Sequence, residues 1–572
     1  MDLRLMLDRP AEAERNAVDA VLGPDQKYNG RVVYGGHAAR ARRHLLLPSL
    51  HAVQDASGAI SRGALAYICD RLTIPPAEAY GVATFYALFN VDGDPGETIH
   101  VCDDIVCAQY GGEDLCAALD AADTDYHRSP CLGQCDRAPA AMFHRPGTGY
   151  GNAAPVDKKS VNKPVFDELP PGLVHQDPAT LTLLRRIGAT DPTSIDSYRE
   201  AGGLQTLWKA REMGPEMVIE ELNTSGLRGR GGAAFPIGMK WKGVRDAPGE
   251  PKYVIANGDE SEPGTFKDRL LMEADPFAVV EAMAVYGYVI GATHGYIYVR
   301  GEYPTAEKRL SSAIAQARRA GWFGDSFDLE VRRGAGAYIC GEETALFASI
   351  EGHRGEPRQK PPFPTQVGVF GKPTGINNIE TLLAALHVID IGGDEFACIG
   401  TNDSTGPKLF CVSGAVEKAG VYEVSFGTTL GELLELAGGI RDSKGLGAVL
   451  MGGAAGVFVD SSALDLPLTF EDTRDAGTTL GSGAMIFFDE ACDFAPVLAR
   501  IARFFRDESC GQCVPCRIGT VRQEEALTRL AAGSPLGSVD DERQRLDDLA
   551  QVMTDASICG LGQTAASAIQ SA

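Results

Sequence analysis

Residues 509–520 read SCGQCVPCRIGT, a stretch that contains three cysteines within seven positions. Cys510, Cys513 and Cys516 form the pattern C-x2-C-x2-C, and Cys559 follows forty-three positions after Cys516. Three thiolates on one tight loop with a distant fourth are typical of a cubane 4Fe-4S cluster. Zinc is the competing interpretation, because it also binds four thiolates, but zinc sites more often use two separate C-x-x-C pairs. The spacing therefore favours a 4Fe-4S site.

The separation of these cysteines also predicts the fold around them. Apolar residues recur at helical spacing over 519–533 and 540–553, with a Gly-Ser-Pro turn at 533–535 between the two runs. Two antiparallel helices of about 14 residues would run out and back by about 20 Å each, and so return Cys559 to the cysteine loop. We therefore expect a C-terminal helical bundle over 491–572 that holds the cluster.

A second set of cysteines lies near the N-terminus. Cys102 and Cys107 follow a strand-like run, TIHVCDD, and Cys131 and Cys135 follow a helix-like run, EDLCAALDAA. Two closely spaced pairs on loops suit a 2Fe-2S cluster, although zinc or a redox dithiol can have similar spacing. Cys116 lies inside the intervening helix and is expected to be buried.

Five further cysteines stand alone in apolar runs, where a thiol usually serves as a small buried side chain. We expect burial for most of these residues, namely Cys69, Cys340, Cys398, Cys411 and Cys492. Cys340 abuts a candidate site described below, so its role is more open than that of the others.

Hydrophobic periodicity divides the rest of the chain into several domains of mixed α/β and α+β class. Residues 1–95 read as helices, 96–150 as a small α/β unit, and 151–175 as a linker rich in Pro, Asn and Lys. Residues 176–400 alternate strands (KYVIAN, HGYIYVRG, FDLEVRRG) with helices, which predicts an α/β sheet domain. Residues 401–490 contain strand-like runs (KLFCVSG, GVYEVSFG, AVLMGG, AMIFFD) around one helix, TLGELLELAGG, and predict a small α+β domain.

A glycine-rich loop, GLRGRGGAAFP, occupies 226–236. Residues 229–234 formally match the dinucleotide fingerprint G-x-G-x-x-G/A, but a helix-like segment precedes them and Pro236 follows, which is the wrong context for that motif. The loop is better interpreted as an anion-binding loop, because glycines let backbone N–H groups approach a phosphate closely. Positive charge would come from Arg228, Arg230 and Lys240. A purely structural turn is the alternative.

Acidic and glycine-rich segments follow two of the predicted strands, at 257–264 (NGDESEPG) and 334–344 (GAGAYICGEET). Open α/β sheets bind ligands just beyond the carboxyl ends of their strands. A single acidic pair in a loop is usually only solvated surface, but two such loops after strands favour a binding site. PPFP at 361–364 and GKPTGINN at 371–378 add an aromatic stacking face and amide donors.

The composition limits the partners. The 572-residue chain has a formal net charge of -24 and a pI of about 4.9, which argues against nucleic acid and anionic membranes as binding partners. No apolar run approaches the roughly 18 residues of a spanning helix, so no direct membrane insertion is expected. The N-terminus lacks the pattern of a secretory signal, and a cytoplasmic location is expected, where fourteen cysteines would not form disulfides.

Several of these motifs, in this order, resemble the NADH-binding flavoprotein subunit of respiratory complex I over roughly 180–572. They are GLRGRGGAAFPIGMKW, NGDESEPGTFKDR, GAYICGEETAL, PPFP, GKPTGINNIET and SCGQCVPCRIGT. Residues 1–150, with CDDIVC and SPCLGQCDRAPA, resemble the thioredoxin-like 2Fe-2S subunit of the same complex. The fusion of the two resembles the diaphorase subunit of NAD-reducing hydrogenases and the beta subunit of NAD-dependent molybdenum or tungsten formate dehydrogenases.

The resemblance implies a thioredoxin-like 2Fe-2S domain at 96–150, an FMN- and NAD-binding α/β domain at 176–400, and a β-grasp-like domain at 401–490. The positions that match FMN-contacting motifs are Gly229, Arg230, Gly231, Lys240, Asn257, Asp259, Glu260, Gly341, Glu342, Asn377 and Asn378. The positions that match NAD-contacting motifs are Phe235, Glu262, Tyr338, Glu343 and Phe363, of which the two glutamates would orient NAD. No side chain is expected to act as a catalytic acid or base, because the flavin performs the hydride transfer.

Two departures from the family pattern stand out. Lys242-Gly-Val follows Trp241, where family members often carry a larger apolar residue near the nicotinamide, and this puts one stacking contact in doubt. The gap between Cys107 and Cys131 is shorter than in typical complex I versions, although both cysteine pairs and the CLGQC turn are intact.

The function implied by the resemblance is reversible electron transfer from a partner through iron–sulfur clusters to FMN, and then as hydride to NAD+, with the 2Fe-2S cluster as a side store. The expected partner is a large catalytic subunit with a molybdenum or tungsten pterin and further iron–sulfur clusters. Formate dehydrogenase is favoured because some hydrogenase diaphorases have degenerate N-terminal cysteines, whereas all four are present here. A hydrogenase diaphorase and a complex I-type module are the alternatives. Two rivals from other classes are a flavin-free electron-transfer scaffold and a zinc-stabilised binding module, which flavin absorbance and iron–sulfur colour would distinguish.

Overall fold

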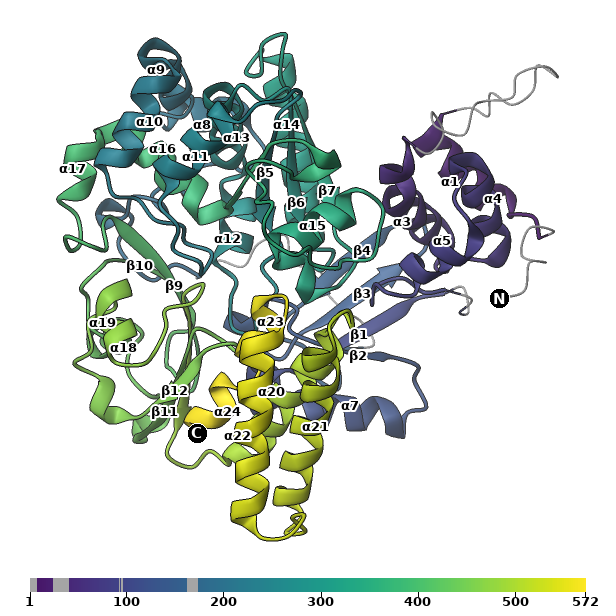
Figure 1. The fold of residues 1–572 in the computed structure, drawn as a ribbon, viewed down its shortest axis with the longest axis vertical. Helices are drawn as coiled ribbons and strands as arrows, with labels where there is room; N and C mark the ends of the chain where they lie inside the picture. The colour runs from purple at the N-terminus through teal and green to yellow at the C-terminus, as the bar shows by residue number, and fades with distance from the viewer. Residues whose placement is uncertain (1–7, 24–40, 92, 94–95, 162–172) are drawn as a thin grey trace.

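The computed structural model describes residues 8–23, 41–91, 93, 96–161 and 173–572. Residues 1–7 and 24–40 of the predicted helical region, and 162–172 of the predicted linker, lie outside these ranges. In Figure 1 the N-terminal helices (purple) and the five-stranded sheet domain (green) lie on opposite sides of the molecule, and two C-terminal helices (yellow) project from it. Among the helices of the described ranges, none has both the length and the apolar character needed to cross a membrane.

The described residues of the N-terminal part contain the α-helices α1 (Glu12–Leu22), α3 (Leu46–Ser57), α4 (Arg62–Leu72) and α5 (Pro76–Ala83). Helix α4 begins where the Ser61 side chain accepts a hydrogen bond from the Ala64 N–H at 3.1 Å, a normal N-cap. The segment after α5 contacts the domain built on the parallel sheet, where the Leu88 N–H donates a hydrogen bond to the Ala335 carbonyl at 3.0 Å. The helical prediction is confirmed for the described residues of this region.

A four-stranded sheet with the order β2-β1-β3-β4 follows. Its strands are β1 (Thr98–Cys102), β2 (His127–Ser129), β3 (Ala141–Arg145) and β4 (Gly149–Ala153), and its helices are α6 (Ile105–Gln109) and α7 (Gly112–Ala121). Cys116 is buried in α7, as predicted. Strand β4 extends into the segment predicted as a linker, and Val156 and Val161 are buried in the core of this same domain.

The third domain is built on a parallel sheet with the order β7-β6-β5-β8. Its strands are β5 (Tyr253–Gly258), β6 (His294–Val299), β7 (Asp328–Arg333) and β8 (Thr374–Asn378). The first three were predicted, whereas β8 was interpreted only as a source of amide donors. The chain runs outward from β5 to β7 and then returns to the other side of β5, so β5 and β8 flank a switch point. A ligand crevice is expected there, beyond the carboxyl ends of the strands.

Helices surround this sheet. The longest are α13 (Pro276–Ile290), α14 (Pro304–Arg319) and α16 (Ile379–Ile391), and α13 packs against both of the others. The shorter ones are α8 (Ile195–Glu200), α9 (Gln205–Met213), α10 (Pro215–Thr224), α11 (Ile237–Asp246), α12 (Lys267–Ala274), α15 (Glu343–Ile350) and α17 (Gly393–Ala397). Helix α13 is apolar on nearly all sides, which fits its burial between other helices.

The fourth domain is a five-stranded sheet with the order β10-β9-β13-β11-β12. Its strands are β9 (Pro407–Gly414), β10 (Gly420–Ser425), β11 (Leu446–Met451), β12 (Val457–Val459) and β13 (Ala484–Asp489), and its helices are α18 (Leu430–Leu436) and α19 (Phe470–Asp475). The central pair, β9 and β13, is parallel and the other pairs are antiparallel. The predicted α+β domain with its one internal helix is confirmed, and β12 and α19 are additional.

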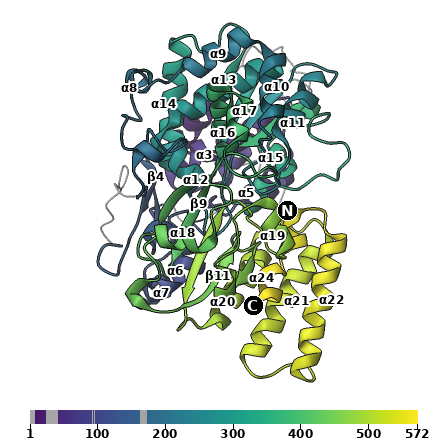
Figure 2. The same cartoon turned by 90° about the vertical axis from the view of Figure 1, so that its left-hand side faces the viewer.

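The C-terminal part consists of α20 (Phe494–Glu508), α21 (Val514–Ala531), α22 (Val539–Ala556), α23 (Gly560–Thr564) and α24 (Ser567–Ser571). Helices α21 and α22 lie side by side in both views (Figures 1 and 2) and pack against each other. Gly519 permits this close approach, because a Cβ there would lie 2.5 Å from Cγ of Met553. The predicted out-and-back hairpin is confirmed.

The isolated cysteines differ in their burial. Cys69, Cys340 and Cys411 are buried, as predicted. The prediction was wrong for Cys398, which is exposed, because it lies at the surface where α17 ends. Cys492 is only partly buried.

Candidate functional site

A cavity with room for about 660 Å³ opens at the carboxyl ends of β5 and β8. This is within the range of about 300–1,000 Å³ for cofactor sites. Nine of the residues predicted from the sequence line it: Gly231, Asn257, Asp259, Glu260, Glu262, Tyr338, Gly341, Glu342 and Asn378. The two acidic segments and the glycine-rich loop, which lie far apart in the sequence, are therefore brought together.

The glycine-rich loop forms one wall with Gly231, Gly232 and Ala233, so backbone and one methyl group face the cavity. A Cβ at Gly231 would lie 3.0 Å from Cβ of Asn378, so a side chain there would have to displace Asn378 of β8. Gly232 has a φ of 112°, which side chains rarely adopt. Gly229 lies outside the cavity wall and closes the loop by donating its N–H to the Phe235 carbonyl at 3.0 Å. Such a cradle of backbone N–H groups suits the phosphate of FMN.

None of the three cations expected at that phosphate, Arg228, Arg230 and Lys240, lines the cavity, and the last two have partners elsewhere. The buried Arg230 side chain donates to the Thr405 carbonyl at 2.6 Å, and its guanidinium lies 4.6 Å from the ring centroid of Phe426. The Lys240 ammonium donates to the Ile376 carbonyl at 3.1 Å, and burial lowers its pKa. Neither residue lines the cavity. Both side chains are held by backbone carbonyls that lie outside the cavity wall.

Polar side chains connect the loops of the cavity to one another. The Asn257 amide donates to the Gly341 carbonyl at 2.9 Å, which links the two acidic segments. The Asn378 amide donates to Asp268 at 2.6 Å. Glu342 accepts the N–H groups of Thr344 and Ala345 and so caps α15. Asn377 lies outside the cavity wall and is buried.

Four carboxyl groups near the cavity have raised pKa values, and burial is the largest cause for each. Burial raises the pKa of Glu260, Glu262 and Glu508 to about 7, and that of Asp259 well above its usual range. Glu262 accepts hydrogen bonds from the Tyr338 hydroxyl at 2.6 Å and from the Ala455 N–H at 2.9 Å, which favour its charged form. Burial therefore favours the neutral forms of these carboxyl groups.

The remaining positions expected to contact NAD lie outside the cavity wall. Phe235 and Phe363 are 47% and 54% exposed, so their rings are free to stack on a ligand. Glu343 pairs with Lys360, which also lies 3.0 Å from Glu342. Sequence reasoning missed Lys360, although its position directly before PPFP was a usable signal.

Sequence reasoning also missed a whole wall of the cavity. It comes from the five-stranded sheet domain and from the C-terminal part, and consists of Gly452, Ala455, Val457, Gly477, Thr478, Thr479, Gly481, Ser482, Gly560, Leu561, Thr564 and Ser567. The glycine-rich runs at 452–456 and 477–483 were the available signal. The cavity is therefore completed by three parts of the chain.

A separate small cavity is lined by all four C-terminal cysteines, Cys510, Cys513, Cys516 and Cys559. Burial raises the pKa of Cys516 to about 12 and that of Cys559 to about 11, so iron binding would have to displace their protons. Ile339 and Leu561 line both this cavity and the larger one. The two sites are therefore separated by a thin apolar wall.

The four N-terminal cysteines are also brought together and buried. Cys102 ends β1, Cys107 lies in α6, and Cys131 and Cys135 lie on the loop after β2 with their sulfur atoms 3.3 Å apart. The pKa of Cys102 is raised well above its usual range, first by contact with Cys107 and then by burial. In the described ranges, no group of three or more His, Cys, Asp or Glu residues has the arrangement of a single-ion site. Four thiols without nitrogen or oxygen ligands have the donor chemistry of an iron–sulfur cluster.

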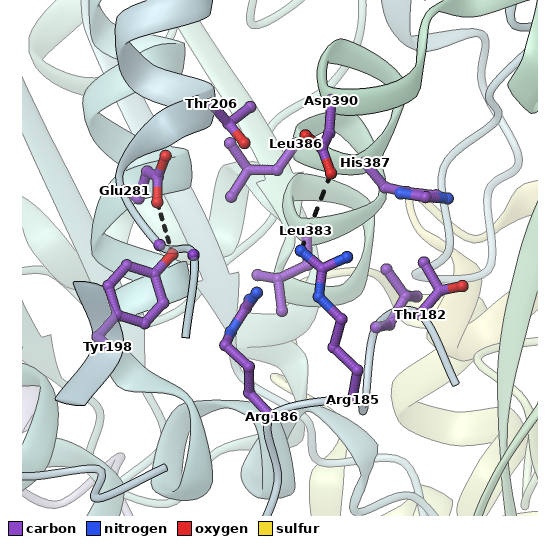
Figure 3. Close-up of a pocket in the computed structure, with 13 residues that line it drawn as sticks. Thr182, Arg185, Arg186, Tyr198, Thr206, Glu281, Leu383, Leu386, His387 and Asp390 are labelled. Carbon is purple, nitrogen blue, oxygen red and sulfur yellow. Dashed lines mark hydrogen bonds and ion pairs between the residues drawn. The ribbon is translucent and has the colours of Figure 1, made fainter. Parts of the chain in front are cut away.

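Another crevice, shown in Figure 3, lies between 182–206 and the helices α13 and α16. It has room for only about 30 Å³, and its main polar groups are paired. Glu281 accepts from the Tyr198 hydroxyl at 2.5 Å and from the N–H groups of Leu204 and Leu207, and Arg185 pairs with Asp390. We interpret this crevice as structural.

Four family models match the chain. Their descriptions are thioredoxin-like [2Fe-2S] ferredoxin (36–161), Nuo51 FMN-binding domain (222–387), SLBB domain (409–452) and NADH-ubiquinone oxidoreductase-F iron-sulfur binding region (496–572). They agree with the four types of domain expected from the sequence. The loops beyond β5 and β8 that line the large cavity lie in the FMN-binding match, and each set of four cysteines lies in an iron–sulfur match. FMN, NADH, a 2Fe-2S cluster and a 4Fe-4S cluster are thus the cofactors of this chain.

Individual relatives agree with these matches. An NADH-quinone oxidoreductase F subunit of Rhizobium meliloti is 43% identical over 399 residues, which is 68% of this chain and 94% of the relative. The HndC subunit of the NADP-reducing hydrogenase of Solidesulfovibrio fructosivorans is 43% identical over 66% of this chain and 78% of the relative. A chain of an NAD+-reducing [NiFe]-hydrogenase crystal structure superposes with a TM-score of 0.80 at 31% identity, over 92% of this chain and 90% of that one. This chain therefore belongs to the family of NADH-quinone oxidoreductase F subunits, the NADH-binding flavoproteins, and carries a thioredoxin-like 2Fe-2S domain on the same polypeptide.

Proposed function

We propose that this chain is the diaphorase subunit of a multi-subunit oxidoreductase and passes electrons between NAD(H) and a partner subunit. One observation carries the proposal: the flavin-sized cavity and the cavity between the four C-terminal thiols have Ile339 and Leu561 as a common wall. Groups separated by single side chains are close enough for rapid electron transfer. When bound, the flavin supplies hydride exchange with NAD and single-electron exchange with the clusters.

We assign the phosphate of the flavin to the backbone N–H groups of 231–233, because Arg230 and Lys240 point away from the cavity. Asn257, Gly341 and Asn378 hold the loops around the ring system in one arrangement. Their hydrogen bonds preorganise the site, so ligand binding need not order these loops.

The nicotinamide nucleotide is assigned to the acidic side of the same cavity. Glu262 and Tyr338 form a hydrogen-bonded pair there, and Phe235 and Phe363 offer exposed rings for the adenine. Glu343 would orient the nucleotide once it is released from Lys360. The roles of these residues, and of the eight cysteines as cluster ligands, are part of this proposal.

For the partner we propose the catalytic subunit of a formate dehydrogenase with a molybdenum or tungsten pterin. The support is the complete set of four N-terminal cysteines, which lie together and are buried. A hydrogenase partner is the second candidate, and it is favoured by the similarity to a chain of an NAD+-reducing [NiFe]-hydrogenase over 92% of this chain. A complex I-type module is the third candidate. The cytoplasmic location stays a prediction.

The test is anaerobic purification of the chain with whatever co-purifies, followed by measurement of FMN, iron and NADH-driven reduction of ferricyanide. About one FMN and about six iron atoms per chain, with NADH activity, are expected for one flavin and two clusters. Iron without FMN or NADH activity would leave an electron-transfer scaffold. NAD+ reduction by formate but not by hydrogen identifies the first partner, and the reverse result identifies the second.

A further inference from the structure

Three buried arginines from outside the thioredoxin-like domain reach its cysteine loops. Arg269 donates to Gln134 and pairs with Asp136 at 2.7 Å, and the other two are Arg300 and Arg500. Arg300 directly follows β6 of the FMN-binding domain and is 3% exposed. Its guanidinium donates to the carbonyl of Cys131 at 2.7 Å and to the carbonyl of Glu260 at 2.7 Å. One side chain therefore joins a cysteine of the 2Fe-2S site to the acidic loop of the flavin cavity.

The third arginine comes from the C-terminal part. Arg500 lies in α20, is largely buried, and pairs with Asp103 at 3.0 Å and with Asp104 at 3.6 Å. These two aspartates lie between Cys102 and Cys107 in the sequence, and Asp104 also accepts the Cys131 N–H at 2.9 Å.

Charge near an iron–sulfur cluster changes its reduction potential. The reduced cluster carries one more negative charge than the oxidised one, and a nearby buried cation stabilises that charge because a low-dielectric interior screens it weakly. Carboxylates have the opposite effect, and here they include Asp103, Asp104 and Glu302, which is 2.8 Å from Arg300. The balance between these groups sets the potential.

We propose that Arg300 and Arg500 raise the reduction potential of the 2Fe-2S cluster, so that the two domains packed against the thioredoxin-like domain determine how readily its cluster accepts an electron. The inference rests on the proposed assignment of Cys102, Cys107, Cys131 and Cys135 as cluster ligands. It gives both arginines the role of positioning and tuning residues, since neither is itself a ligand. It also makes the potential depend on the docking of three parts of one chain.

The experiment is an EPR-monitored redox titration of the 2Fe-2S signal in the full-length protein. At the potential where the wild-type cluster is half reduced, the ratio of reduced to oxidised cluster is expected to fall about tenfold in R300Q, which corresponds to a shift of about 59 mV for one electron. R500Q should also lower the reduction potential of the cluster. E302Q should raise the reduction potential, because this substitution removes a negative charge and leaves Arg300 in place.

Matched variants distinguish the effect of the lost charge from the effect of a disturbed structure. R300K keeps the charge and should stay near the wild-type potential, and R300Q/E302Q removes both charges and should lie between the single variants. R128Q is the surface control: Arg128 also pairs with Asp103 at 3.0 Å, but its side chain is 41% exposed, so solvent should limit the change to less than about twofold.

Two outcomes would overturn the proposal, and they are distinguishable. If the R300Q and E302Q titrations superimpose on the wild type, or shift in the same direction, the arginines do not set the potential. If R300Q does not fold, R500Q and the charge-neutral double variant provide the same comparison. If the 2Fe-2S signal persists unchanged in C131S, the ligand assignment itself is wrong.

Discussion

The hydrogen bond between Tyr338 and Glu262 predicts how the KM for NADH depends on pH. Burial raises the pKa of Glu262 to about 7, and the Tyr338 hydroxyl, 2.6 Å away, opposes that rise because it stabilises the carboxylate. In Tyr338→Phe this hydrogen bond is lost. A hydrogen bond to a charged group contributes about 1.5 kcal/mol or more, and about 1.4 kcal/mol equals one pKa unit. The pKa of Glu262 should therefore rise by about one unit.

The assay is the KM for NADH with ferricyanide as acceptor, measured across pH. Ionised Glu262 adds negative charge to a cavity that receives an anionic nucleotide, so KM should rise as pH passes through the pKa of this residue. In Tyr338→Phe the same rise should occur about one pH unit higher. Tyr80→Phe, at an exposed position outside the site, is the matched control and should leave the curve unchanged.

Two results would refute this reasoning. One is a Tyr338→Phe curve that coincides with the wild type, which would mean that the hydroxyl does not affect the titration. The other is a rise in KM that survives in Glu262→Gln, which would assign the titration to Glu260 or Glu508, since these carboxyls also have pKa values of about 7. If the assignment is correct, Tyr338→Phe should have no further effect on the pH profile in the Glu262→Gln background.

Three further predictions follow from single sites. Cys559→Ser should lower iron from about six to about two atoms per chain and remove the 4Fe-4S EPR signal, with FMN retained; an unchanged iron content would exclude this cysteine as a ligand. Glu281→Ala should lower the free energy of unfolding by about 3 kcal/mol or more, because it leaves one hydroxyl and two backbone N–H groups unpaired. Glu216→Ala, which breaks a solvent-exposed pair with Arg245, should cost far less because water screens that pair, so equal losses in chemical denaturation would contradict the structure. The pKa of Glu262 is about 7 in the folded chain against an ordinary 4.5, so folding favours its neutral form. Its contribution to stability should thus decline from about pH 4.5 to about pH 7, and Glu262→Gln should reduce that decline in denaturation measured across this range.

The sequence by itself determined the features that depend on short-range chemistry. Cysteine spacing identified both sets of thiols, because ligands of one cluster must lie on tight loops or be returned by elements of suitable length. The helical runs on either side of 533–535 predicted the hairpin that returns Cys559, since periodicity and turn residues are local properties. Strands such as β5, β6 and β9 were predicted for the same reason.

Only the tertiary structure decided which way side chains point and which distant segments meet. Arg230 and Lys240 stand beside the glycine-rich loop in sequence, yet packing against Thr405 and Ile376 directs them away from the cavity. Strand β8 became recognisable only through its pairing with β5, and Cys398 is exposed because α17 ends at the surface. Packing between domains creates the cavity wall from 452–482 and 560–567. It also creates the hydrogen bond from Arg300 to the Cys131 carbonyl. Such contacts join residues far apart in the chain, and local periodicity carries no information about them.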